Sequence, residues 1–152
     1  MREILFRGKR CDNEEWAQGY YIRADHHWHK HGIHKDWLVC GASSNGGWFA
    51  LHNKYAVKAE TVGQFTGLTD KTGKRIFEGD ILHIAKITDG FGCYYQPPLD
   101  YPVNVVVKWD LCAWMWETIC DDKRYITFPE AWCHYDSEVI GNIHDNPELL
   151  GV

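Results

Sequence analysis

Residues 67–82 read GLTDKTGKRIFEGDIL, and this stretch decides the fold. The Asp that begins DKTGK can accept hydrogen bonds from the backbone that follows it, and its late Gly tolerates a positive φ angle, which together are typical of a short hairpin loop. The flanking residues 65–68 and 75–77 are rich in aromatic and β-branched side chains, as strands are. We therefore predict a β-hairpin that turns at residues 70–74, followed by a second turn at residues 78–80.

The same stretch also resembles a phosphate-binding loop, because a Gly is followed by polar residues and then by Gly-Lys. Five residues separate Gly67 from Gly73, which is too many for such a loop, and Lys74 is followed by Arg75 where Ser or Thr is needed. The residues after Lys74 do not favour the helix whose N-terminus would face the phosphate. We reject nucleotide binding here and keep the hairpin turn.

The rest of the chain is dominated by strand signals. Short runs rich in aromatic and β-branched residues recur at roughly ten-residue spacing with turn residues between them, which is typical of an all-β barrel or sandwich. Residues 103–109 alternate with a period of two, so one face of that strand is nearly all apolar. Helix is scarce, and the clearest signal is a short turn at residues 146–150, where Asn is followed by Pro and Glu. The expected strands are residues 4–6, 16–23, 37–40, 48–51, 81–87, 103–109, 111–119 and 138–143, with a turn at GASSNGG, residues 41–47.

Charge and cysteine usage exclude several classes of function. The net charge of −5 and the pI near 5.9 oppose broad attraction to nucleic acid or to anionic membranes. Arg7, Lys9 and Arg10 form a local basic cluster, which we interpret as a solvated strand end or turn. The N-terminal residues do not form a signal peptide, and no run is long enough to span a membrane. The six cysteines contain no C-x-x-C pair, so we expect reduced thiols and a cytoplasmic protein.

Three segments carry a resemblance to a known family. The chain resembles the YopX family of phage and prophage proteins in three segments, which follow one another in the family's order. They are the opening MREILFRGKR, residues 60–82 (ETVGQFTGLTDKTGKRIFEGDIL) and the closing VIGNIHDNPELL at residues 139–150. The strand VVVKW at residues 105–109 also fits, whereas residues 26–48 and 90–102 show no family pattern. The resemblance implies one mainly β domain over residues 1–152, with an N-terminal β-rich lobe (1–59) and a small SH3-like, partly open barrel (60–152). It implies self-association in some members and no catalytic residues or cofactors.

The histidine-rich run HHWHKHGIH at residues 26–34 is the strongest candidate for metal binding. On a strand His27, His29 and His31 would face one side, and imidazoles in such an arrangement bind zinc, copper or nickel. Lys30 and Lys35 add positive charge beside any bound cation. We therefore favour an exposed histidine-rich loop or edge strand and keep the metal site as the weaker reading.

The tryptophans of the second half are the candidate binding face. Trp114 and Trp116 share one face of a strand, and Trp109 lies in the preceding strand, so these rings could stack on bases or sugars. The alternative is that they fill the core of a small barrel.

Neither the thiols nor the carboxylates form a catalytic set. Cys133 and His134 are neighbours without the surroundings of a cysteine hydrolase, and Asp121-Asp122 and the Glu78/Asp80 pair suit turns. We assign no catalytic or cofactor-binding residue.

These observations favour a non-catalytic binding or assembly module of a phage or prophage, located in the cytoplasm of the bacterial host. The expected partners are a phage or host protein and further copies of the chain. The alternative is a β-barrel protein associated with single-stranded nucleic acid, which the acidic balance opposes. A metal-binding protein that uses the histidine run is the least favoured reading.

Overall fold

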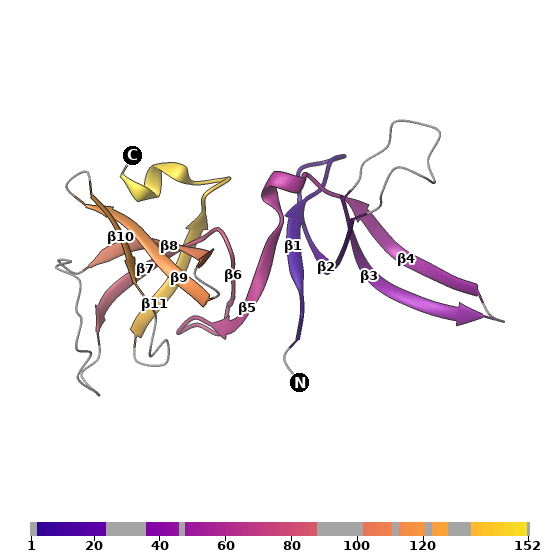
Figure 1. Ribbon diagram of the computed structural model, residues 1–152, viewed down its shortest axis with the longest axis horizontal. Coiled ribbons are helices and arrows are strands. Elements are labelled where there is room, and N and C mark those ends of the chain that lie inside the picture. The colour runs from indigo at the N-terminus through magenta and orange to yellow at the C-terminus, as the bar shows by residue number, and fades with distance from the viewer. Residues whose placement is uncertain are drawn as a thin grey trace. The chain divides into compact units, whose positions relative to one another are not determined.

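The computed structural model describes residues 3–23, 36–45, 48–87, 102–110, 113–120, 123–127 and 135–151. In these ranges the protein is mainly β, with antiparallel strands in two sheets (Figure 1). The chain divides into two compact units, Met1–Phe65 and Thr66–Val152. The sequence had suggested lobes at 1–59 and 60–152, and these bounds stay a prediction.

The first sheet has the strand order β4-β3-β2-β1-β5-β6. Strand β5 crosses the boundary between the units: Gly63 and Gln64 pair with β1, whereas its last residues belong to the second unit. The strands are β1 (Phe6–Lys9), β2 (Trp16–Arg23), β3 (Asp36–Asn45), β4 (Trp48–Ala56), β5 (Gly63–Thr69) and β6 (Arg75–Phe77).

Strand β2 has one buried and one exposed side. Ala17 and Gly19 are buried while Gln18 and Tyr20 are exposed, which is the alternation of a strand with one face on a core. Ala17 packs with Leu38 and Val57 in the core of the first unit. The 3₁₀ turn η2 (Ala59–Thr61) contacts β1, where Thr61 Oγ1 accepts a hydrogen bond of 2.9 Å from the Lys9 N–H. Core packing therefore constrains the side of β2 that carries Ala17, and not the opposite side with Gln18 and Tyr20.

The prediction of a turn at GASSNGG, residues 41–47, is wrong for residues 41–45, which belong to strand β3. Strand β3 continues through Asn45, and Ser43 and Ser44 pair with Ala50 and Phe49 of β4. Each pairing satisfies the backbone of both strands, so the long β3–β4 hairpin outweighs the weak strand preference of Gly, Ser and Asn. Residues 46–47 lie outside the described residues.

The second sheet has the strand order β10-β9-β8-β7-β11. Its strands are β7 (Asp80–Ile87), β8 (Val103–Asp110), β9 (Ala113–Cys120), β10 (Lys123–Thr127) and β11 (Tyr135–Asn142). Val105 and Val107 of β8 are buried with Leu82 and Ile84 of β7, as the alternation in residues 103–109 predicts. Strands β10 and β11 lie at opposite edges, and the strands that the structure describes form an open sheet, not a closed barrel.

The chain ends in the 3₁₀ turn η4 (Pro147–Leu150), which confirms the expected short C-terminal turn. Pro147 starts it, and Gly151 ends it in the left-handed conformation, with φ 73°. Asn104 of β8 holds this turn by donating a hydrogen bond of 2.8 Å to the Leu149 carbonyl oxygen. Across the described ranges, none of the helical segments has the length and apolar character that a membrane crossing requires.

Candidate binding surface

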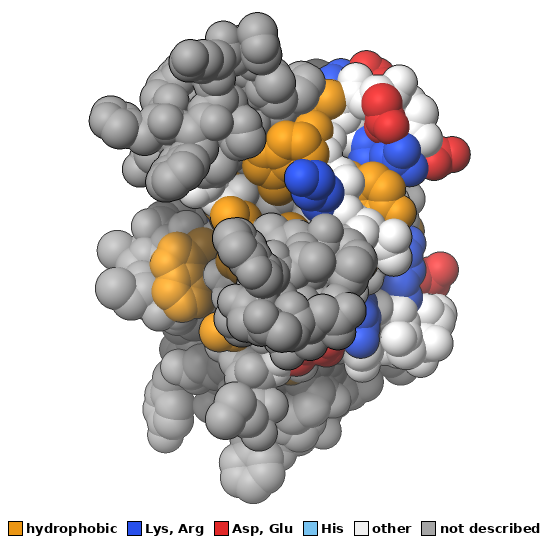
Figure 2. Space-filling view, turned by 90° about the vertical axis from the view of Figure 1, so that its right-hand side faces the viewer, with side chains coloured by type: hydrophobic (Ala, Val, Ile, Leu, Met, Phe, Trp, Pro, Cys, Tyr) orange, Lys and Arg blue, Asp and Glu red, His pale blue; other side chains and the backbone are white. Residues whose placement is uncertain are grey.

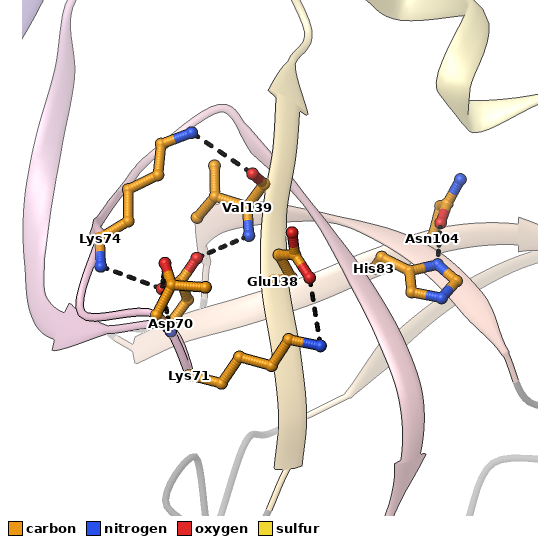
Figure 3. A network of polar contacts seen from close by, with 8 residues as sticks. Asp70, Lys71, Lys74, His83, Asn104, Glu138 and Val139 are labelled. Atoms are coloured by element: carbon orange, nitrogen blue, oxygen red, sulfur yellow. Dashed lines mark hydrogen bonds and ion pairs between the residues drawn. The ribbon is translucent and has the colours of Figure 1, made fainter.

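The predicted hairpin turn is present, and its own aspartate fills the position where an anion would bind. Asp70 is buried, and its Oδ1 accepts hydrogen bonds from the backbone N–H groups of Thr72 (2.8 Å) and Lys74 (3.0 Å). Asp70 Oδ2 accepts a further bond of 2.9 Å from the Val139 N–H of β11 (Figure 3). Gly73 has a φ of 87°, the positive angle expected of the late glycine in this turn. Because the carboxylate takes these amide groups, the turn is a structural clamp and not a phosphate loop.

The two lysines of the turn also contact β11. Lys74 Nζ donates to the Val139 carbonyl oxygen over 3.3 Å, and Lys71 Nζ lies 3.1 Å from Glu138 Oε2 (Figure 3). The Lys71 N–H donates to the Ser137 carbonyl oxygen over 3.1 Å. The turn is thus attached to β11 at three successive residues, 137 to 139.

The second predicted turn is structural as well. Gly79 has a φ of 79°, its N–H donates to the Val107 carbonyl oxygen over 2.8 Å, and its own carbonyl oxygen accepts from the Ile143 N–H over 2.9 Å. The buried Asp80 accepts a hydrogen bond of 2.8 Å from the Phe77 N–H. Asp80 therefore shapes the backbone of this turn.

The tryptophans proposed as a binding face occupy different environments. Trp114 is 9% exposed and belongs to the core of the second unit, whereas its cross-strand partner Trp109 is 51% exposed. The two rings meet edge to face with centroids 4.9 Å apart. Trp116 lies in β9 opposite Val107 and Thr127, and its side chain is not described. Whether these residues bind a ligand stays a prediction.

The metal-site residues His27, His29 and His31 lie outside the described residues, as do Asp121, Asp122, Cys133 and His134. The metal site therefore stays a prediction. In the part of the chain that the structure does describe, no group of three or more His, Cys, Asp or Glu residues is placed to hold a metal ion.

A second candidate surface lies on the first unit, on the exposed side of β2. Lys9 pairs with Trp16 and Arg7 with Gln18, so both cations share the exposed side of the sheet with Trp16. The Arg7 guanidinium lies 4.7 Å from the centroid of the Trp16 ring, and Lys9 Nζ lies 5.8 Å from it. Cations at these distances are attracted to the negative face of the indole ring.

The other end of β2 repeats this arrangement. Ile22 pairs with Trp37 of β3, and Lys54 of β4 places its Nζ 5.4 Å from the centroid of the Trp37 ring. Between the two ends lies Tyr20, which is 60% exposed and belongs to the same side of the sheet. We call this set the outer surface: Arg7, Lys9, Trp16, Gln18, Tyr20, Ile22, Trp37 and Lys54. Basic and hydrophobic side chains also lie next to one another on the face drawn in Figure 2.

A cavity of about 400 Å³ adjoins the Trp37 end of the outer surface. Arg10 lies 4.4 Å above the Tyr55 ring centroid there, but its Nε also donates to Asp12 Oδ1 over 2.9 Å. This hydrogen bond raises the pKa of Arg10 and lowers the pKa of Asp12. Burial raises the pKa of the Cys11 thiol, which disfavours the reactive thiolate. The cavity is lined by Arg10, Cys11, Asp12, Trp37, Lys54, Tyr55 and Ala56.

Charge is distributed unequally between the two units. Residues 1–65 contain nine Lys and Arg against seven Asp and Glu, a formal charge of +2. Residues 66–152 contain seven against fourteen, a formal charge of −7, and the two values give the total of −5. The acidic balance of the chain is therefore a property of the second unit.

The outer surface was only partly visible in the sequence. The sequence shows the cluster Arg7, Lys9 and Arg10, but its interpretation as a solvated strand end or turn does not include the aromatic rings beneath it. Trp16 follows Lys9 closely in sequence, so a hairpin register would have paired them. The contact of Lys54 with Trp37 depends on the β3–β4 register. The expected turn at residues 41–47 does not predict this register, because residues 41–45 are paired strand.

Together the fold and this surface define a small, mainly β protein of two antiparallel units, with cations stacked on aromatic rings on one of them. The chain belongs to the YopX family, because the family model described as "YopX protein" matches residues 5–151. A solved structure, protein EF1440 from Enterococcus faecalis, is 22% identical over 99% of both chains with a TM-score of 0.53, which is a likeness of fold. A search of curated proteins found no match.

Proposed function

We propose that this protein is a non-catalytic binding module that acts through the outer surface of its first unit. The observation that carries the proposal is the set of three cation–aromatic contacts near the two ends of β2, Arg7 and Lys9 at Trp16 and Lys54 at Trp37. Aromatic side chains and Arg are enriched where proteins bind partners, and exposed apolar patches often mark such sites.

The chemistry of the titratable groups supports a binding role over a catalytic one. The buried carboxylates Asp70 and Asp80 accept hydrogen bonds from backbone N–H groups, so they are occupied with local structure. Burial raises the pKa of Cys11, the opposite of what activates a nucleophilic thiol.

The proposal includes the biological setting and the assembly state. We place the protein among phage or prophage accessory proteins in the cytoplasm of a bacterial host, with a phage or host partner. We also propose that it self-associates, since β4 is the outer strand of one sheet and β10 and β11 of the other, and edge strands can pair with another chain. An SH3-like, partly open barrel in the second unit is proposed on the family resemblance alone.

Affinity capture from prophage-induced host cells tests this function. Tagged wild-type protein is compared with the double variant Arg7→Ala/Lys54→Ala and with Lys71→Ala, which removes a half-exposed cation of the second unit. Proteins, nucleic acid and untagged copies of the chain are measured in each eluate. We expect the double variant to lose the partner that the wild type and Lys71→Ala retain. Identical eluates from all three proteins would contradict the proposal.

A further inference from the structure

We propose that the outer surface binds single-stranded nucleic acid. This inference rests on the proposed function, because it names the ligand of the same surface. The full chain is acidic, which argued against nucleic acid, but the acidic excess lies in residues 66–152 and the unit that carries the surface is basic. Charge complementarity with phosphate therefore exists where the aromatic rings are.

The aromatic rings follow one strand direction along β2. Trp16 and Tyr20 lie on the exposed side of β2, and Trp37 lies beside Ile22 in the neighbouring strand. Ile22 lies six positions after Trp16, which corresponds to about 20 Å along an extended strand. Base stacking on aromatic side chains is independent of base identity, so such a row binds a strand with little sequence preference.

The cations lie where they can contact the phosphate backbone of a nucleic-acid strand that follows these rings. Arg7 and Lys9 flank Trp16, and Lys54 flanks Trp37, so both ends of the aromatic row carry positive charge within 6 Å of a ring, at 4.7, 5.8 and 5.4 Å. Phosphates would therefore contact Arg7, Lys9 and Lys54.

The shape of the surface favours a single strand over a duplex. Tyr20 and Ile22 are 60% and 38% exposed on a sheet face, which offers flat rings and not a projecting helix or ribbon. Reading a duplex requires an element that enters a groove, and stacking requires bases that are already unpaired. The polar Gln18, between Trp16 and Tyr20, can donate to or accept from a base edge.

Fluorescence polarisation with labelled oligothymidylate and oligouridylate at low salt tests the inference on the full chain. We expect the wild type to bind both single strands more tightly than a duplex of the same length. Tyr20→Ala and Trp37→Ala should each weaken binding by between about fivefold and a hundredfold, the range that stacking on one base supplies. Tyr20 is mostly exposed, so its variant keeps the test valid if Trp37→Ala does not fold.

The competing candidate from the sequence is Trp109, and Trp109→Ala removes this half-exposed tryptophan from the second unit. It should bind the oligonucleotides like the wild type. The inference is overturned if no single strand binds at low salt, if duplex binds better, or if Trp109→Ala weakens binding while Tyr20→Ala does not. Loss of a captured protein partner by Arg7→Ala/Lys54→Ala, without any oligonucleotide binding, would overturn this inference and leave the proposed function standing.

Discussion

Asp70 is the residue that turns a weak local preference into a defined hairpin. Burial raises the pKa of its carboxyl, but hydrogen bonds from Val139, Thr72 and Lys74 outweigh burial and leave the pKa below its ordinary value. A carboxylate with a lowered pKa stabilises the fold above the pKa of the unfolded state, about 3.9, and loses that contribution as pH falls further. The clamp between the turn and β11 is therefore strongest at neutral pH.

Asp70→Asn should destabilise the protein at neutral pH by about 1–3 kcal/mol, because an amide NH₂ would replace one oxygen that accepts from backbone N–H groups. The free energy of unfolding of the wild type should fall below about pH 4, and the variant should lack this part of the fall. Urea unfolding at several pH values measures both effects.

Glu148→Gln makes the same chemical change at an exposed carboxylate in η4. Its stability should stay within about 0.5 kcal/mol of the wild type. If Asp70→Asn behaved like Glu148→Gln, Asp70 would not be the clamp described above.

Strand β2 is the element that connects the core to the outer surface. Its bounds, residues 16–23, are those expected from the sequence, but its alternation of buried and exposed side chains was not predicted. The hairpin at residues 70–74 and the terminal turn were also predictable, because Asp, Gly and Pro act through local backbone geometry. The length of β3 was not, because the Gly and Ser residues 41–44 are held as strand by pairing with β4.

Gly19→Ala tests how closely β2 and β3 approach each other. A Cβ atom at Gly19 would lie 2.6 Å from the Val39 carbonyl oxygen, a backbone atom that cannot move away cheaply. We expect a loss of about 1–3 kcal/mol in stability, the usual cost of overpacking, measured by thermal unfolding.

Gln18→Ala is the neighbouring control, since Gln18 is exposed. Its change should be about 0.5 kcal/mol or less. Equal effects of the two substitutions would show that the close approach at Gly19 does not limit the packing of β2 on β3.

At the scale of the whole molecule, the decisive property is the separation of charge between the units, +2 and −7. The net charge of −5 follows from the composition, and by itself it argues against binding to nucleic acid. The lobes expected from the sequence, 1–59 and 60–152, already separate the charge in this way, whereas the register that places Lys54 beside Trp37 is a product of the fold. The candidate metal residues His27, His29 and His31 lie outside the described residues and stay a sequence prediction.

The central claim is that the outer surface binds a single strand through stacked rings and a few phosphate contacts. The salt dependence of oligothymidylate binding tests it most directly, because each phosphate contact contributes about −0.7 to the slope of log K against log salt concentration. Contacts by Arg7, Lys9 and Lys54 predict a slope of roughly −2, reduced by about 0.7 in Lys54→Gln. A salt-independent affinity, or a slope that Lys54→Gln leaves unchanged, would contradict the account.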